Sequence, residues 1–333
     1  MKKSKSKITK KLLVTIITVS VFIVIMLSLI ITNIFIPVKY LSDYAVKKEP
    51  LKEGTMRVAF IDVGYGDCTV VEFPDGRNML LDGGNGRYTN NSKILKYLNK
   101  CGIDTIDFLV CTSVKGQYCG GLSEIMRYKD VNTVYAPYCK NVYVTEEYKV
   151  FNDAVEKSGA EVKISEYGAG GGNSENGFFT FLSPSVHTNP QGEYSAFNLE
   201  QSNKNTEAIS AVVWLEYCGT SFLLTGGAND TVLTNLCNSY SVAGKDFPVQ
   251  MESCTILKVA AQGNKYSACA MLYDLIKPRT AIMSVGENGY GCPSVQALSN
   301  ALNYANNFYR TDEHGTVVFE VSKNGFKAYG EKL

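Results

Sequence analysis

The sequence predicts an α/β fold in which helices and β-sheets form layers around one core. Runs of β-branched and apolar residues with the length of strands recur from Met56 to the C-terminus, and segments with helical spacing of apolar residues separate several of them. Many of these runs end in short Gly-rich or polar loops, which is where α/β folds carry their functional groups. A segment of about 280 residues is large for one domain but sufficient for a layered core.

The N-terminal segment is predicted to be a membrane anchor that is separate from this domain. Six lysines lie within residues 2–11, and residues 12–37 carry no charge. Roughly 20 apolar residues cross a bilayer, so this run is long enough. A cleaved signal peptide is the alternative, but its apolar core is typically about 7–15 residues long and ends in small residues, unlike the sequence Ile34–Pro37.

The chain is therefore divided into a cytoplasmic basic tail (1–11), a transmembrane anchor (12–37), a linker (38–54) and the α/β domain (55–333). The lysines would hold the N-terminus in the cytoplasm, which places the domain outside the cell on a single-pass membrane protein.

Charge and cysteine content limit the function classes. The net charge is +1, but the six tail lysines leave 27 basic against 32 acidic residues in the remainder, or about −5. A mildly acidic domain is not suited to bind a phosphate backbone by bulk electrostatics.

Of the ten cysteines, Cys111 and Cys218 lie in apolar strand-like runs, which favours buried thiols; the pairing of the cysteines stays open.

The elements follow from the pattern in chain order. Strands are predicted at 56–64, 68–73, 78–84, 106–112, 133–137, 160–165, 178–184, 208–217, 220–227, 254–260, 280–286 and 315–321. Helices are predicted at 92–99, 121–128, 146–158, 230–238, 268–276 and 293–305. Residues 168–205 are rich in Gly, Asn and Ser and are expected to form loops around one strand. The glycine run 168–172 lacks the Lys-Ser/Thr of a phosphate-binding loop and is expected to be a flexible linker.

Five strand ends carry the polar loops that could form a site, and their sequences resemble a known family. They are 82–84, 112–121, 226–228, 260–264 and 286–293. "FIDVGYGDC" and "NMLLDGG" resemble the opening of the metallo-β-lactamase-like domain of the competence protein ComEC family, which internalises DNA. "LVCTSVKGQYCGGL" resembles its T-H-x-H-x-D-H-x-G-G loop, "SFLLTGGA" its L-T-G-D-A, "ILKVAAQGNKYS" its L-K-V-A-H-H-G-S, and "MSVGENGYGCPS" its S-V-G-x-N-x-Y-G-H-P. The resemblance implies a four-layer αββα metallo-β-lactamase-like sandwich, preceded here by one transmembrane helix.

The same alignment implies that the metal ligands of the family have been replaced. Family members use zinc or manganese, which His and Asp residues hold. The positions that match those ligands carry other residues in this chain: Ser113, Lys115, Gln117, Tyr118, Gly227, Ala261, Gln262 and Cys292. A hydrolytic zinc site needs about three His or carboxylate ligands. The chain has only His187, in the loop-rich segment, and His314, in an expected hairpin turn, so the sequence predicts no catalytic residues and no bound cofactor.

Several alternatives stay open at particular residues. Asp62, Asp67 and Asp82 match acidic positions that the family keeps; they could hold Mg²⁺ or Mn²⁺, or they could cap turns, which is the favoured interpretation. Cys119 and Cys292 flank the degenerate pocket and could pair or simply pack. A further group could form a polar, aromatic cleft for an anion or a sugar, or a solvated rim: Lys115, Lys265, Tyr118 and Tyr266.

The favoured interpretation is a pseudoenzyme with a binding or regulatory role at the cell surface. The alternative is a metal-dependent hydrolase of phosphodiesters such as extracellular DNA, with a site rebuilt from at least two of the three Asp residues and a base. The partners are the membrane, through the N-terminal helix, and an unidentified protein or ligand; nucleic acid is implied by the resemblance alone. A DNA channel is not implied, because one predicted span cannot form a multi-span pore.

Overall fold

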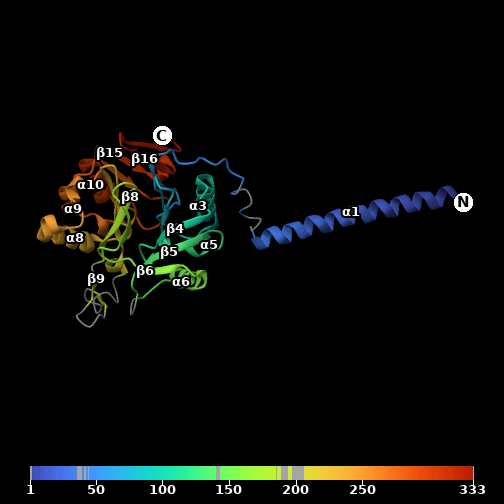
Figure 1. Ribbon diagram of the computed structural model, residues 1–333, viewed down its shortest axis with the longest axis horizontal. Helices are drawn as coiled ribbons and strands as arrows, with labels where there is room; N and C mark the ends of the chain where they lie inside the picture. Colours follow the sequence, from blue (N-terminus) through green and yellow to red (C-terminus); the bar gives the residue numbers. More distant parts are fainter. Residues whose placement is uncertain are drawn as a thin grey trace. The chain divides into compact units, whose positions relative to one another are not determined.

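The computed structural model describes residues 2–35, 40, 43, 45–139, 143–184, 186–188, 194–196 and 206–332. The chain divides into two compact units, residues 1–47 and 48–333. In the first unit, α1 (Lys2–Phe35) forms a single helix that includes most of the predicted anchor (Figure 1). Within the described residues, however, no helix combines the length and apolar character needed to cross a membrane, so the prediction of a transmembrane span is not confirmed.

Two large sheets form the second unit. The first sheet has eight strands in the order β17-β16-β1-β2-β3-β4-β5-β6, and the second has seven in the order β15-β14-β13-β12-β11-β8-β7. The first comprises β1 (Met56–Phe60), β2 (Thr69–Glu72), β3 (Asn78–Leu81), β4 (Thr105–Val110), β5 (Asp130–Ala136), β6 (Glu161–Ile164), β16 (Val317–Ser322) and β17 (Gly325–Gly330). The second comprises β7 (Gly170–Asn173), β8 (Gly177–Ser183), β11 (Val212–Tyr217), β12 (Thr220–Leu224), β13 (Ile256–Lys258), β14 (Thr280–Met283) and β15 (Asn307–Arg310).

Helices cover the outer faces of both sheets, so the second unit is an α/β two-sheet sandwich in four layers, as predicted. Figure 1 shows α3 (Tyr88–Cys101), α5 (Leu122–Met126) and α6 (Glu146–Ser158) on one side of β4 and β5. On the other side lie α8 (Asp230–Ala243), α9 (Ala270–Ile276) and α10 (Val295–Tyr304). The short helices are α4 (Gly116–Cys119) and α11 (Thr311–His314), and β9 (Val186–Thr188) pairs with β10 (Tyr194–Ala196) apart from both sheets.

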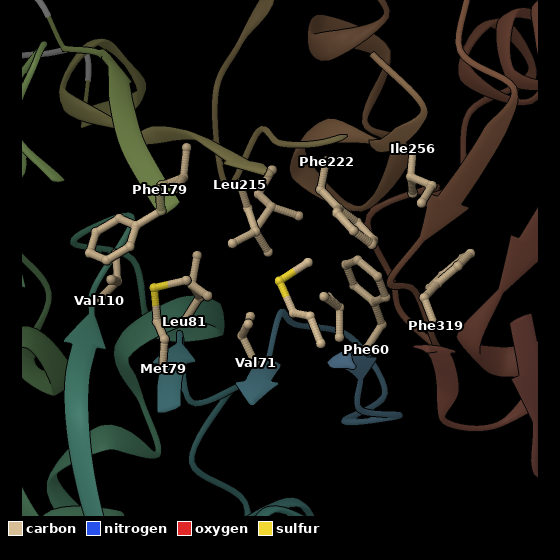
Figure 2. Packing of buried hydrophobic residues seen from close by; sticks show 14 of the residues in the cluster. Phe60, Val71, Met79, Leu81, Val110, Phe179, Leu215, Phe222, Ile256 and Phe319 are labelled. Carbon is tan, nitrogen blue, oxygen red and sulfur yellow. The ribbon is translucent and has the colours of Figure 1, made fainter. Parts of the chain in front are cut away.

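The main core lies between the two sheets. Figure 2 shows Phe60, Val71 and Met79 of the first sheet facing Leu215 and Phe222 of the second. A second cluster packs α8 and α9 against the outer face of β11, β12 and β13, around the fully buried ring of Trp214. Burial of this apolar surface is the main force that holds the layers together.

The glycine run that was expected to be a flexible linker is instead β7, the edge strand of the second sheet. It pairs antiparallel with β8, and the backbones approach so closely that side chains would not fit. A Cβ at Gly170 would lie 2.1 Å from the carbonyl oxygen of Phe179, and one at Gly172 would lie 2.3 Å from that of Gly177. The glycines thus permit strand pairing there, which their composition alone does not indicate.

Replacement of Phe319 by Ala tests the placement of the core. The Phe319 ring is fully buried and meets Phe60 and Phe222 edge-on, with ring centroids 5.9 and 5.8 Å apart. We expect Phe319→Ala to lower the free energy of unfolding of the full chain by about 3–5 kcal/mol, because it leaves a cavity between the sheets. Urea unfolding followed by the fluorescence of Trp214 measures this change.

The control is Leu302→Ala, since Leu302 is 64% exposed on α10. It should change the unfolding free energy by less than about 0.5 kcal/mol. Equal losses at the two positions would contradict the placement of Phe319 between the sheets.

Candidate functional site

The five polar junctions singled out in the sequence meet at one edge of the sandwich. They follow strands of the parallel regions, β3-β4 in the first sheet and β12-β13-β14 in the second, whose carboxyl ends lie together. Backbone hydrogen bonds join them: Asp82 N–H to the Val110 carbonyl (2.8 Å), Gly83 N–H to that of Tyr118 (2.6 Å), and Ala261 N–H to that of Gly226 (2.9 Å). The loops therefore form one continuous surface.

The loop 112–121 is held in place by glycines that leave no room for side chains. A Cβ at Gly120 would lie 2.7 Å from the backbone of Asn85, and one at Gly121 would lie 2.2 Å from the carbonyl oxygen of Gly83. Ser113 is buried beneath the loop, and its hydroxyl has no hydrogen-bond partner within the described chain. The loop shape thus depends on backbone packing, and the side chains at its tip are free to differ.

A cavity of about 530 Å³ opens where these loops meet. Its lining contains six of the eight positions that match family ligands and also Lys265 and Tyr266, so the structure brings together the polar, aromatic cleft that the sequence suggested. The six positions are Lys115, Gln117, Tyr118, Gly227, Ala261 and Gln262. Ser113 and Cys292 are not among the described lining residues.

Tyr118 occupies the space beside Gly227, the position that matches the family's bridging Asp. The Tyr118 ring is buried, and its hydroxyl donates to Oε1 of Gln262 at 3.4 Å. A Cβ at Gly227 would lie 3.0 Å from the Tyr118 hydroxyl, tighter than ordinary contact. The large side chain of Tyr118 thus occupies space that is available because Gly227 has no side chain.

Asp67 is buried in an ion pair with Lys258, the last residue of β13. The Lys258 ammonium donates to Oδ2 of Asp67, and both side chains are almost fully buried. Burial raises the pKa of Asp67, while the charge of Lys258 and the neighbouring Gln262 amide act in the opposite direction. Lys258 was not among the site residues predicted from the sequence, because a lysine at a strand end carries no signal that it will be buried.

Asp82 is fully buried and bonds to the strand end beside it. Its carboxylate accepts from the backbone N–H of Thr112 (2.8 Å) and from the Thr112 hydroxyl (2.6 Å). Burial and the nearby charge of Asp67 raise its pKa to about 7, although the bonds from Thr112 and the charge of Lys258 oppose the shift. The backbone of Asp82 has a φ of 60°, a left-handed conformation that Asp and Asn tolerate better than most residues.

Asp62 is bound away from the other two carboxylates. It accepts from the backbone N–H of Gly64 (3.1 Å) and from the Lys93 ammonium (2.9 Å). The structure thus places Asp67 and Asp82 near one another beneath the surface and ties Asp62 to α3.

The two candidate cysteines are both free thiols, as are the other eight. The Cys119 thiol donates to the Lys115 carbonyl (3.3 Å), and burial raises its pKa to about 12. Burial also raises the pKa of Cys292, while Tyr65 and Asn264 beside it act in the opposite direction. A protonated thiol is a poor nucleophile and a poor metal ligand.

The residues at this edge do not fit the zinc or manganese of the family. Across the part of the chain that the structure describes, no three His, Cys, Asp or Glu side chains are grouped so that they could hold a metal ion. His314 bonds through Nδ1 to the backbone of Arg310 (2.9 Å), and the side chain of His187 lies outside the described residues. What the cavity offers instead is amide, hydroxyl and ammonium groups.

Comparison with known proteins agrees with the resemblance seen in the motifs. A curated protein of Bacillus subtilis (strain 168), ComE operon protein 3, is 24% identical over 281 residues, which is 79% of this chain and 32% of that protein. The chain is ComEC-like. It spans about a third of the length of this relative, and no protein-family model matches it.

Solved structures with a similar arrangement have low sequence identity. Tm1679, described as a metal-dependent hydrolase of the β-lactamase superfamily, is 13% identical with a TM-score of 0.46, covering 78% of this chain and 98% of that one. CmlA, a diiron β-hydroxylase from Streptomyces venezuelae, is 12% identical with a TM-score of 0.46, covering 81% and 55%.

The raised pKa of Asp82 predicts a pH-dependent stability. Because the folded-state pKa (about 7) exceeds the ordinary 3.8, the folded chain binds more protons than the unfolded chain between these values. The stability contributed by the protonated carboxyl is fully present below the lower value and is lost as pH rises through the upper one. We expect the free energy of unfolding to fall between about pH 5 and about pH 7, by up to about 1 kcal/mol per pH unit.

Asp82→Asn should flatten this slope, since the amide stays neutral, tolerates the left-handed backbone and can bond to both Thr112 groups. A residual slope of the same sign is expected from Asp67, whose pKa is also raised. The exposed Asp246 provides the control, and Asp246→Asn should keep the wild-type slope. Urea unfolding across this pH range measures all three proteins, and an unchanged slope in Asp82→Asn would refute the assignment.

Proposed function

We propose that this ComEC-like chain is a non-catalytic, membrane-anchored binding or regulatory protein whose former metal pocket takes a ligand. The observation that carries the proposal is that other residue types occupy the positions that match the family's metal ligands. Tyr118 lies against Gly227, and Gln262 and Lys115 line the cavity where the family has metal ligands. The pocket keeps a volume of about 530 Å³, within the usual range of small-molecule sites, so the fold retains room for a ligand.

The alternative, a hydrolase rebuilt around carboxylates, is less compatible with these contacts. It requires two of the three Asp residues to face a common cleft. Asp67 is neutralised by Lys258, and Asp82 accepts two bonds from Thr112, so both carboxylates already have partners in the interior. A divalent cation at Asp67 would also meet the charge of Lys258. Nucleic acid as a partner remains part of this alternative, on the resemblance alone.

The anchor is the second part of the proposal, and it rests on the sequence. The lysines of residues 2–11 and the uncharged run 12–37 support a single span with the N-terminus in the cytoplasm and the domain outside the cell.

Metal content and turnover test the non-catalytic role. The full chain, purified without chelator, is expected to hold well under one Zn or Mn per chain by mass spectrometry, because the cavity offers no set of ligands for either metal. We also expect no phosphodiesterase activity in Mg²⁺, Mn²⁺ or Zn²⁺. Any weak activity should persist in Asp82→Ala, which would identify it as a contaminant. One or more metals per chain, with turnover that Asp82→Ala abolishes, would refute the proposal.

Membrane fractionation tests the anchor. The full chain should stay with the membrane after carbonate extraction, and a variant that lacks residues 12–37 should be released, because the deleted run supplies the apolar surface. Protease added to intact protoplasts should digest the domain if it lies outside. Release of the full chain by carbonate would contradict the anchor.

A further inference from the structure

Polar side chains lie at the floor of the cavity and directly behind it. A Cβ at Gly227 would lie 3.0 Å from the Tyr118 hydroxyl and 3.1 Å from the Ser210 hydroxyl, so both hydroxyls lie beside the bare backbone of Gly227. Gln262, which is fully buried, also lines the cavity and contacts the same Tyr118 hydroxyl. Three side chains from three different loops therefore meet at one point.

Two of these groups have unsatisfied hydrogen-bonding capacity. Within the described part of the chain, neither the Ser210 hydroxyl nor Nε2 of Gln262 has a partner with hydrogen-bond geometry, although the Gln262 amide lies close enough to the Asp67 carboxylate to act against the rise of its pKa. A buried polar group without a partner lowers the stability of the fold, so a bound acceptor that reaches either group would offset that loss.

The backbone holds Gln262 in its place on the floor. Ala261 and Gln262 both have left-handed conformations, with φ of 45° and 54°. Such residues persist only where the surroundings fix them, and here the Ala261 N–H bonds to Gly226 and the Asn264 N–H bonds to Ala261, both at 2.9 Å. Strained backbone that fixes a side chain at a cavity wall is typical of ligand sites.

The charges around the cavity favour an anion. The charged lining residues are Lys115, Lys265 and Asp230, a net charge of +1. Beneath the floor, Lys258 offsets the negative charge of Asp67. The first residues of α8, a helix of 14 residues, also line the cavity, and the positive end of a helix dipole attracts negative charge.

We propose that the cavity binds a small molecule through an oxyanion group, a carboxylate or a phosphomonoester. A metal site presents lone pairs to a cation, whereas Gln262 at the cavity wall and Ser210 beside Gly227 have N–H and O–H groups for an acceptor, and Lys115 and Lys265 add positive charge at the rim. The remaining volume accommodates the rest of the ligand beside the rings of Tyr65 and Tyr266. This inference rests on the proposed function, because it needs a pocket without a metal.

Calorimetric titration of the full chain in mild detergent, both with and without EDTA, tests the inference. Inorganic phosphate and acetate are the probes for the two oxyanion classes, and chloride at equal ionic strength controls for general salt effects. We expect at least one oxyanion to bind with saturation at one site per chain, and chloride not to bind. Lys265→Met should weaken binding about fivefold, because it removes one rim charge. Lys245→Met should leave affinity unchanged, since Lys245 is exposed just after the opposite end of α8.

Two variants at Gly227 test whether a negative charge at the floor of the cavity weakens the binding of an anion. Gly227→Asp and Gly227→Asn add side chains of nearly equal size next to Tyr118 and Ser210. The Asp carboxylate repels an anion and accepts the donors itself, so we expect Gly227→Asp to bind at least about tenfold more weakly than Gly227→Asn. Cooperative urea unfolding of both variants separates loss of binding from loss of fold.

Three outcomes would overturn the inference: no saturable binding of either oxyanion by the folded wild type, equal affinity of the two Gly227 variants, or binding that disappears with EDTA. The last would mean that a metal carries the anion, which would overturn the proposed function as well. A chain that is metal-free, inactive and indifferent to both oxyanions would refute only the inference and leave the non-catalytic role intact.

Discussion

The ion pair between Asp67 and Lys258 connects the two halves of the sandwich at the site. Asp67 lies in the loop before β2 of the first sheet, and Lys258 ends β13 of the second. The backbone of Asp67 also accepts from Gly84 (2.8 Å) and donates to Gln117 (3.1 Å), so the same residue positions two neighbouring loops. Loss of one partner would leave a buried charge, which typically costs about 3–5 kcal/mol. The geometry of the cavity therefore depends on this pair and on the two backbone hydrogen bonds of Asp67.

The backbone packing explains how the loop around Ser113–Tyr118 keeps its shape with replaced side chains. Gly120 and Gly121 allow the loop to lie directly against residues 83–85, and any larger residue there would force the loops apart. Lys115 and Gln117 carry no such restriction, because they are only partly buried and line the cavity. The conformation of the loop and the chemical groups that it presents to the cavity thus depend on different residues. The presented groups can change while the loop conformation is retained.

Much of the fold was predictable, because it follows from local periodicity. The helix predicted at 146–158 was found as Glu146–Ser158, where Thr145 caps the first turn and Gly159 ends the helix with a φ of 73°. The strand β7 was missed, since glycine composition signals flexibility while its pairing with β8 depends on a distant close approach. The cavity residues Lys115, Tyr118 and Tyr266 were identified from the motifs. Ser210 and Lys258 were not, because their importance arises from burial, which periodicity does not report for a single polar residue.

The charge of the cavity lining depends on which carboxylates are bound by donors inside the protein. Asp67 and Asp82 are buried at this edge, and each is bound to a donor that belongs to the chain: an ammonium for Asp67, a hydroxyl and a backbone N–H for Asp82. With both carboxylates bound inside the protein, the charged groups that line the cavity are two lysines and Asp230, beside hydroxyl and amide groups. Replacing the residues of the loop 112–121 alone would not reverse this, because Gly227 would still offer no carboxylate and Lys258 would still neutralise Asp67. The preference for a cation or an anion is therefore a property of the assembled edge of both sheets, and no single loop determines it.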